Sequence, residues 1–558
     1  MRRPLPALLV GLLAVAALAG CSRSPSGASP GAKAHPAAIL LRGLGAEPDS
    51  LDPQKARSVE AQRVLRDICE GLTTLDKSGG VAPGIAKRWQ VSADGKTYTF
   101  TLRHEARWSN GQPVVGADFV AGLRRLVDPA TGSQYAEVVN AIVNASDIVA
   151  GHKPPASLGV SAPGPYTVVI RLRNPAPYLP ALLAHPSTCP VEPVTLANDK
   201  DAYARPGNLP SDGAFVLSQW VHGSYIYLRR NRYYWDDSAT RLDGVKYLIS
   251  SDENSELTLY RAGQLDITDV IPRAQYGWIR SHLGNQLHIT PELGVYFYGF
   301  NLRRAPFKDD AKLRRALSMV IDREQLVHLV LRTGELPAYG WVPPGVAGYT
   351  PQSPSWRALP LAQRIAEARR LYAEAGYSAA RPLRFVLRYN TGEVHSELAI
   401  AIASMWRQAL GARVTLRSEG FTSLLQDINR GNVQMFRSSW IGDYNDAYGF
   451  AQYFKSDFGI NLTHYDNPAY DTLLDRAAAE VDPAKRRALL EQAERLMLHD
   501  APVIPIYFYA SKHLVKPRVT GWYNNIMNVT YSRSLGLRGT FRSPPPSNAP
   551  RSARRSVP

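Results

Sequence analysis

RSSWIGDYND, residues 437–446, joins a short β-prone run to a polar turn. Trp440 and Ile441 are residue types that strands favour, and the turn that follows is rich in Gly, Asp and Asn and contains Asp443. One interpretation is a core strand over 439–441 that buries its tryptophan and is followed by a polar loop. The other is an exposed strand edge with a carboxylate just beyond its end.

The second interpretation predicts a specific chemistry. The backbone N–H and C=O groups of a free strand edge can pair with any extended peptide, whatever its side chains. A carboxylate just past the strand end, here Asp443, can bind the ammonium group of such a peptide. Residue types alone leave both interpretations open.

The N-terminus has the pattern of an export signal. Its apolar run over 5–19 is too short to span a bilayer, since spanning takes about 20 apolar residues. The run ends in LAGC, residues 18–21, which resembles the lipobox of bacterial lipoproteins. We therefore expect a signal peptide over 1–20, a lipidated Cys21 and a flexible Ser/Pro/Gly/Ala-rich tether over 21–36. An ordinary secretory signal with an incidental cysteine is the alternative.

The composition of the chain indicates which classes of partner it can bind and whether it can form a disulfide. The 558 residues carry a formal net charge of +17. Nucleic acid is not expected to bind an exported chain, so the charge favours attraction to anionic lipid or a solvated basic face. Residues 542–558 are rich in Pro, Ser and Arg and are typical of a disordered basic tail. Export permits a disulfide between Cys69 and Cys189, and two free buried thiols are the alternative.

Strand and helix patterns mix along the body without a strict βαβ rhythm and without internal repeats. This mixture predicts an α/β body of several layers built from discontinuous segments. No stretch after the signal is long and apolar enough for a transmembrane helix. The strongest strand patterns cover 38–42, 88–91, 97–102, 167–172 and 224–229. Helical patterns cover 59–71, 114–126, 309–333, 361–376, 395–410 and 483–499.

Catalytic and metal-binding motifs are missing from the sequence. There is no Gly-x4-Gly-Lys-Ser/Thr loop, so ATP hydrolysis must come from another chain. There is no His-Glu-x-x-His motif, and the twelve histidines show no metal-ligand spacing. We predict no enzyme activity, no cofactor and no metal site. An exported peptide hydrolase is the alternative, because a scattered Ser-His-Asp triad leaves no local signature.

A set of short motifs points to one family. Trp440-Ile441-Gly442-Asp443-Tyr444-Asn445 is similar to the ligand-clamping segment of the oligopeptide-binding proteins of bacterial ABC importers. The chain resembles the general oligopeptide branch of that family rather than its dipeptide, nickel or haem branches. Matches run from residue 40 to residue 535 and cover most of the mature chain. They include Ser50-Leu51-Asp52-Pro53, Cys69-Glu70-Gly71-Leu72, Trp108-Ser109-Asn110-Gly111, His185-Pro186-Ser187-Thr188, Tyr389-Asn390-Thr391 and Thr463-His464-Tyr465.

The resemblance implies an α/β, periplasmic-binding-protein-like fold with two lobes, a hinge and an additional third domain. By analogy, domain I takes residues 37–69, 193–293 and 511–541. Domain II takes residues 70–192, and domain III takes residues 294–510.

The resemblance also implies a set of peptide-binding residues. In the family the ligand lies extended between the lobes and gains a strand partner on each side. Here these partners would be 57–59 and 439–441. Asp443 would pair with the peptide ammonium group, and Arg437 and His395 would meet the far end of the peptide or its carboxylate. Loop capping for Asp443 and helix capping for His395 are the structural alternatives. The implied binding residues are Arg57, Ser58, Val59, Tyr135, Asn390, His395, Arg437, Ser439, Trp440, Ile441, Asp443 and Tyr509.

The sequence departs from the family at two places. Some relatives carry an acidic residue near position 57, where this chain has Arg57. This difference suggests a shift in preference toward acidic peptides. Relatives with a disulfide beside the clamp have cysteines where this chain has Ile441 and Gly294, so the clamp lacks that covalent link.

The function implied by the resemblance is that of a lipid-anchored solute-binding receptor. It would capture short peptides in a cleft between lobes that close. It would then deliver them to an ABC permease with separate ATPase subunits. The receptor would be an exported monomer in the periplasm or on the outer face of the cell envelope, held to the membrane only by its lipid. A murein-peptide receptor and a chaperone-like peptide holder of the same fold are alternatives.

Overall fold

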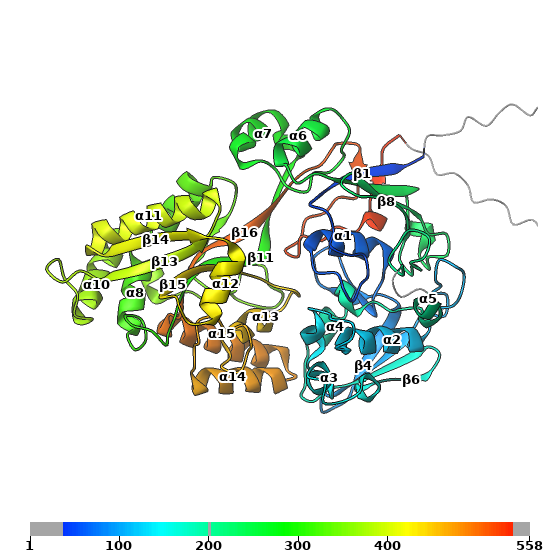
Figure 1. Ribbon diagram of the computed structural model, residues 1–558, viewed down its shortest axis with the longest axis horizontal. Coiled ribbons are helices and arrows are strands. Elements are labelled where there is room, and N and C mark those ends of the chain that lie inside the picture. Colours follow the sequence, from blue (N-terminus) through cyan, green and yellow to red (C-terminus); the bar gives the residue numbers. More distant parts are fainter. Residues whose placement is uncertain (1–36, 199–201, 540–558) are drawn as a thin grey trace, which may run out of the picture. The chain divides into compact units, whose positions relative to one another are not determined.

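The computed structural model describes residues 37–198 and 202–539 (Figure 1). The predicted signal peptide, Cys21, the tether and the basic tail lie outside these residues. Within the described ranges, no helix has both the length and the apolar composition needed to cross a bilayer.

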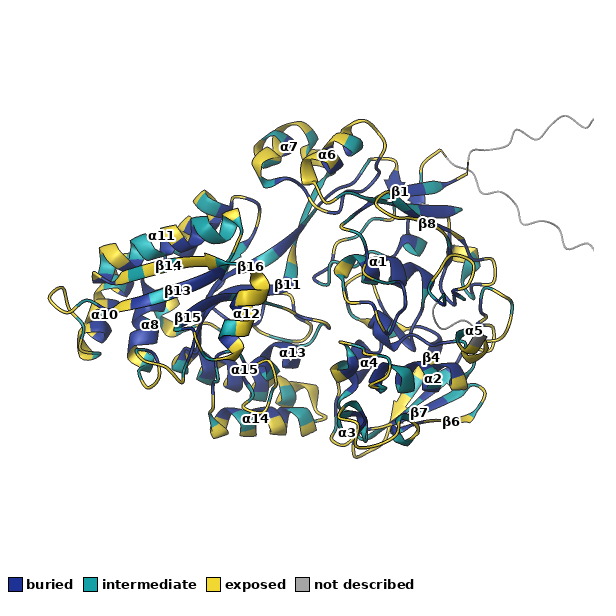
Figure 2. Ribbon diagram, in the orientation of Figure 1, coloured by how far each residue is buried: buried dark blue, intermediate teal, exposed yellow. Residues whose placement is uncertain are grey.

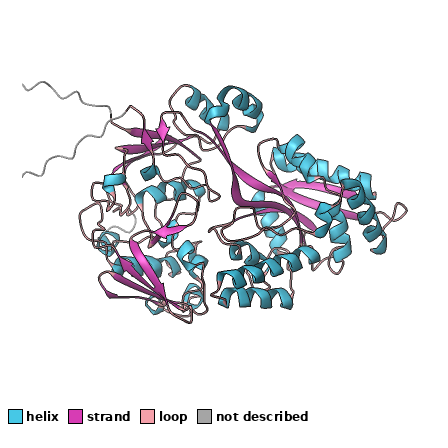
Figure 3. Ribbon diagram, turned by 180° about the vertical axis from the view of Figure 1, so that it is seen from behind, coloured by secondary structure: helices cyan, strands magenta, loops and turns pink. Residues whose placement is uncertain are grey.

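Three sheets of four or more strands organise the described chain (Figure 3). The first has the order β1 (Ile39–Gly45), β10 (Gly244–Ile249), β9 (Tyr225–Arg230), β8 (Phe215–Val221). The second has the order β4 (Ala86–Val91), β5 (Thr97–Leu102), β7 (Thr167–Arg171), β6 (Val160–Gly164). The third has the order β12 (Leu336–Pro337), β16 (Val503–Leu514), β11 (Leu287–Phe300), β15 (Met435–Ile441), β13 (Arg384–Asn390), β14 (Arg413–Glu419). Two smaller pairs are β2 (Thr73–Leu75) with β3 (Val81–Pro83) and β17 (Val519–Thr520) with β18 (Gly536–Leu537).

The helices cover these sheets. The longer ones are α1 (Val59–Ile68), α2 (Gly116–Val127), α6 (Glu253–Arg261), α7 (Tyr276–Leu283), α8 (Ala311–Met319), α10 (Leu361–Glu374), α11 (Glu393–Leu410), α12 (Phe421–Asn429), α14 (Pro468–Ala479) and α15 (Pro483–Asp500). The shorter ones are α3 (Ala145–Val149), α4 (Leu179–Leu182), α5 (Pro193–Asn198), α9 (Arg323–Gln325) and α13 (Tyr448–Ala451).

The hairpin of the second sheet forms as the sequence predicts. In β5 the side chains of Tyr98, Phe100 and Leu102 are buried while their neighbours are less so, which is the alternation of a half-buried strand. The connecting turn contains Gly95 at φ +68°, a conformation that glycine adopts without a steric cost. The α/β class and the strands predicted near 38–42, 167–172 and 224–229 are likewise confirmed.

The third sheet is packed on both faces (Figure 2). One apolar cluster joins it to α8, α10 and α11, and another joins it to α12, α14 and α15. Its two longest strands, β11 and β16, continue past the sheet toward α7 as a two-stranded ribbon (Figure 1). Their pairing shifts register between Pro291 and Val295, close to the predicted boundary of domain III. The three sheets fall largely within the three predicted domains, whose exact boundaries stay predictions.

Most predicted helices are confirmed within a few residues, and one is wrong. The single helix expected over 309–333 is broken into α8, α9 and a π-helical turn at Leu326–Leu331. The break arises because Asp322 starts a new helix, with its side chain accepting a hydrogen bond from the Gln325 backbone N–H. α14 is not among the helices predicted from the sequence, although Asn467 before Pro468 is a standard helix start.

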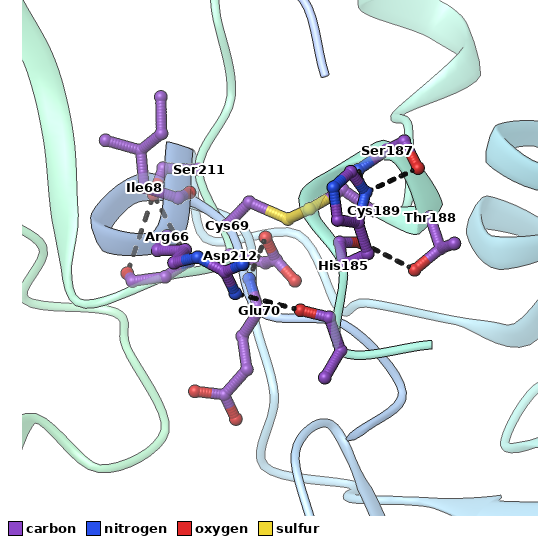
Figure 4. Close-up of a disulfide and its surroundings, with 12 residues drawn as sticks. Arg66, Ile68, Cys69, Glu70, His185, Ser187, Thr188, Cys189, Ser211 and Asp212 are labelled. Carbon is purple, nitrogen blue, oxygen red and sulfur yellow. Dashed lines mark hydrogen bonds between the residues drawn. A yellow bond between two sulfur atoms is a disulfide. The ribbon is translucent and has the colours of Figure 1, made fainter. Parts of the chain in front are cut away.

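A disulfide joins Cys69, just past the end of α1, to Cys189 (Figure 4). The two Cα atoms lie 6.3 Å apart, within the usual range for a disulfide. The alternative of two free thiols is therefore wrong. The bond fastens the turn that carries His185 to the end of α1 and closes a loop of 120 residues in sequence.

Candidate functional site

The first residues of β15 pair with a neighbouring strand on each side, whereas its last residues pair with a strand on one side only. It pairs with β11 along its whole length but with β13 only at Met435 and Phe436. Among the described residues, 437–441 therefore have no strand partner on the β13 side. The start of the strand is buried, whereas Ile441 is 48% exposed. Within 439–441, Ser439 and Trp440 are half-buried and Ile441 is exposed, so this part of β15 agrees with the exposed strand edge and not with a core strand that buries its tryptophan.

Trp440 is held in place rather than simply buried. Its indole N–H donates to the Gly449 carbonyl oxygen at 3.0 Å, and its ring packs against Tyr453. On the neighbouring strand, Gly294 pairs with Ile441. A Cβ added to Gly294 would lie 2.4 Å from the Ile441 side chain, so glycine leaves the room that the isoleucine fills.

Asp443 lies two residues beyond the strand end, as predicted. The preceding residue, Gly442, donates its backbone N–H to the Leu293 carbonyl oxygen at 2.8 Å. The Asp443 side chain is solvent-accessible, and no hydrogen bond or ion pair reaches its carboxylate from the described residues. The surrounding protein nevertheless displaces much of its water, and this desolvation raises the pKa of Asp443 to about 6. Its oxygens are free to accept from a ligand.

A cavity of about 240 Å³ lies beside Asp443. Tyr135 lines it, with its hydroxyl accepting from the Gln62 side chain at 2.8 Å and its ring against His185 at 4.6 Å. Burial and the charge of Asp443 both raise the pKa of Tyr135. The predicted residue Tyr135 therefore lies at the same end of the site as Asp443. Gln62 lies there too and is not among the residues predicted from the sequence.

Arg437 marks the other end of the strand edge. Its guanidinium donates to Asn390 Oδ1 at 3.0 Å and to the Tyr509 hydroxyl at 3.1 Å, and it lies 4.5 Å from the centre of the Tyr296 ring. Arg437 is only 8% exposed, yet no carboxylate in the described chain pairs with it. A buried cation normally has an anionic partner, so this end is suited to bind an anion.

His395 completes this cluster. Its Nδ1 lies 3.3 Å from the Tyr296 hydroxyl. Burial, reinforced by the charge of Arg437, lowers the pKa of His395 to about 4, so its imidazole is neutral at pH 7. The helix it belongs to starts after Gly392, so His395 is not a helix cap. The structure thus brings Arg437, Asn390, Tyr509 and His395 together and adds Tyr296, which no local pattern singled out.

Residues 57–59, the other implied strand partner of the ligand, do not form a strand, and the helix predicted over 59–71 begins here as α1. Ser58 is the N-cap of α1, with its hydroxyl accepting from the Ala61 N–H, and Val59 is the first helical residue. The backbone N–H groups of Arg57 and Ser58 donate to Asp49 instead of forming a ladder. The Arg57 guanidinium also lies 3.2 Å from Asp49, which offsets its charge. Whether this segment meets the ligand stays a prediction.

The fold and the site define the class of protein. The chain is a periplasmic-binding-protein-like α/β protein of several domains, with a charged cavity beside an open strand edge. The pattern of the bacterial extracellular solute-binding proteins, family 5 Middle, matches residues 80–462, and the chain belongs to this family. It is accordingly a solute-binding protein and not an enzyme.

Several relatives are similar over nearly their whole length. The periplasmic oligopeptide-binding protein OppA of Salmonella typhimurium is 38% identical over 486 residues, which is 87% of this chain and 89% of that protein. The probable deoxycholate-binding periplasmic protein YgiS of Escherichia coli is 39% identical over 495 residues, 88% of this chain and 92% of that protein. The periplasmic murein tripeptide-binding protein MppA, in its unliganded open form, superposes with a TM-score of 0.81 at 37% identity. That match covers 90% of this chain and 98% of MppA.

Proposed function

We propose that this chain is a lipid-anchored receptor for short peptides. It would bind both the amino and the carboxyl terminus of the peptide and deliver the peptide to an ABC-type permease with separate ATPase subunits. One observation carries the proposal: among the residues that the structure describes, a free carboxylate, Asp443, and a buried guanidinium without a counter-ion, Arg437, flank one open strand edge. An extended peptide offers the matching ammonium, carboxylate and backbone groups. The names of OppA and MppA, both peptide-binding proteins, support this choice of ligand.

The spacing of the two charges favours a short ligand. Residues 437 and 441 lie four positions apart on β15, about 13 Å at the rise of an extended strand. Asp443 follows two residues later, in the loop. A peptide of about three to five extended residues can therefore reach both charges. Ser439, Trp440 and Ile441 would supply backbone pairing, which tolerates many side chains.

The main alternative ligand comes from another relative. YgiS carries the name of a probable deoxycholate-binding protein. A bile acid offers a carboxylate to Arg437 but no ammonium group to Asp443, so it would leave that carboxylate unpaired. A murein peptide offers both groups and remains an alternative within the peptide class.

Native mass spectrometry of protein purified from its own cells tests the proposal. We expect co-purifying masses that fragment as peptides of about three to five residues. Calorimetric titration with such peptides should then give saturable binding, and incubation should leave them intact. Bound bile acid, or no binding of any short peptide, would contradict the proposal.

Arg437→Gln should weaken the binding of peptides that have a free C-terminal carboxylate. The glutamine keeps hydrogen-bonding capacity but removes the charge, so we expect the Kd to rise about ten- to a hundredfold. The Kd of the C-terminally amidated peptide should change little, because that ligand lacks the carboxylate. Titration calorimetry on both peptides provides the measurement.

Arg280→Gln is the matched control for this variant. Arg280 is exposed on α7 and belongs neither to the cavity lining nor to the implied binding residues, so its loss should leave both affinities within a factor of about two. Equal weakening of the free and amidated peptides by Arg437→Gln would show that Arg437 acts on the fold rather than on the ligand carboxylate.

Peptide affinity should fall as the pH drops through about 6. Only the ionised Asp443 carboxylate attracts an ammonium group, and its pKa of about 6 leaves roughly a tenth of it ionised at pH 5. We therefore expect the Kd to be about tenfold higher at pH 5 than at pH 8. His395, with its pKa near 4, stays neutral over this range and does not contribute. An N-acetylated peptide should show a flat profile, and a matching slope for that peptide would refute the assignment.

A further inference from the structure

The loop that carries Asp443 is held by several hydrogen bonds to neighbouring elements. Gly442 is bound to Leu293, as described above. Arg486 on α15 holds Asp446 through two hydrogen bonds of 2.8 Å. Asp446 in turn accepts from the Tyr448 backbone N–H at 2.8 Å. The contacts of Asp446 lie within predicted domain III, and Leu293 on β11 is the last residue of the middle segment of predicted domain I.

One aromatic side chain reaches this loop from predicted domain II. Tyr178, the residue before α4, stacks on Tyr444 with ring centres 5.4 Å apart and planes at 19°. It also stacks on Tyr448 at 4.9 Å and 13°. Tyr178 thus contacts two rings at once, Tyr444 of the loop and Tyr448 at the start of α13, and Tyr444 is the residue that follows Asp443.

The Tyr444 side chain is closely packed on several sides. It is 4% exposed and packs with Ala181 and Leu182 of α4. A Cβ added to Gly449 would lie 3.1 Å from the Tyr444 ring, so the loop closes tightly around that side chain. The backbone of Asp443 therefore sits between one neighbour anchored on β11 and another anchored on predicted domain II.

We propose that Tyr178 is a positioning residue that fixes the ammonium-binding carboxylate of Asp443 from predicted domain II, through Tyr444. The carboxylate has no hydrogen-bond partner of its own among the described residues, so its place depends on the backbone around it. Stacking of Tyr178 restrains that backbone, and the restraint lets the receptor distinguish a free amino terminus from a blocked one. This inference rests on the proposed function, because it assumes that Asp443 reads the peptide ammonium group.

The test is the ratio of affinities for a free tripeptide and its N-acetylated form, measured by calorimetry on the full chain. The wild-type chain should prefer the free form. Tyr178→Ala should weaken binding of the free form about tenfold, since two stacking contacts are lost, and should leave the acetylated form nearly unchanged. Tyr178→Phe should behave as wild type, because the Tyr178 hydroxyl makes no hydrogen bond in the described structure. Tyr233→Ala, at an exposed tyrosine outside the contact, should also behave as wild type.

The possible outcomes separate this inference from the proposed function. If Tyr178→Ala weakens both peptides equally, or neither, while the wild-type chain distinguishes them, the positioning role is wrong and the ammonium site stands. If the wild-type chain binds both forms equally, the ammonium site is wrong and this inference falls with it. Tyr178→Trp restores a stacking ring, and recovery of the wild-type ratio in that variant would exclude a general loss of folding.

Discussion

Asp443→Asn is expected to weaken the binding of peptides with a free amino terminus about ten- to a hundredfold. The substitution keeps the size and shape of the side chain but removes the charge that would pair with the ammonium group. A hydrogen bond to a charged partner contributes about 1.5–3 kcal/mol, which corresponds to that range of Kd. Titration calorimetry with one tripeptide at pH 8, where Asp443 is ionised, gives the comparison.

The same variant should not lose stability. The pKa of Asp443 is raised in the folded protein, so folding disfavours its charged form and the carboxylate opposes folding at neutral pH. The neutral asparagine avoids this unfavourable burial of charge. The midpoint of urea-induced unfolding should therefore stay the same or rise. Asp466→Asn, at an exposed aspartate elsewhere, is the matched control for affinity. Unchanged affinity in Asp443→Asn would overturn the ammonium site, and a lowered midpoint would point to the loop-capping alternative.

Removal of the disulfide by the double substitution Cys69→Ala and Cys189→Ala is expected to have the largest effect on stability. The bond closes a loop of 120 residues, and a loop of this length restricts the unfolded chain strongly. We expect the free energy of unfolding to fall by about 4 kcal/mol, measured by urea denaturation. The bond also anchors the end of α1, which carries Gln62, to the turn with His185, so peptide affinity should fall as well.

Reduction of the wild-type chain provides the control. Dithiothreitol should lower the unfolding midpoint of the wild-type chain to that of the double variant and should not affect the variant itself. A double variant as stable as the oxidised wild type would show that packing alone holds this junction. A single Cys189→Ala variant should match the double variant, because one thiol cannot form the bond.

Local pattern was sufficient for much of the fold. The alternation in β5, the turn at Gly95 and the apolar stripe of α10 each depend on residues within one element, and each formed where expected. The helix predicted over 309–333 failed for a local reason too, since Asp322 is a capping residue inside an apolar stretch. The resemblance predicted more of the candidate site than local sequence patterns did. It placed four residues in one group: Arg437, Asn390, His395 and Tyr509.

The sequence by itself determined the α/β class, the family and the order of strand, glycine and carboxylate over 437–446. Only the tertiary structure decided that the strand edge beyond Phe436 is open, because this depends on where β13 stops pairing with it. It also decided that Asp443 is free while Arg57 is paired, and that Tyr178 reaches the loop of Asp443. The physical reason is distance along the chain. Strand partners, desolvation and ring stacking come from residues far apart in sequence, and no local pattern records which of them will meet.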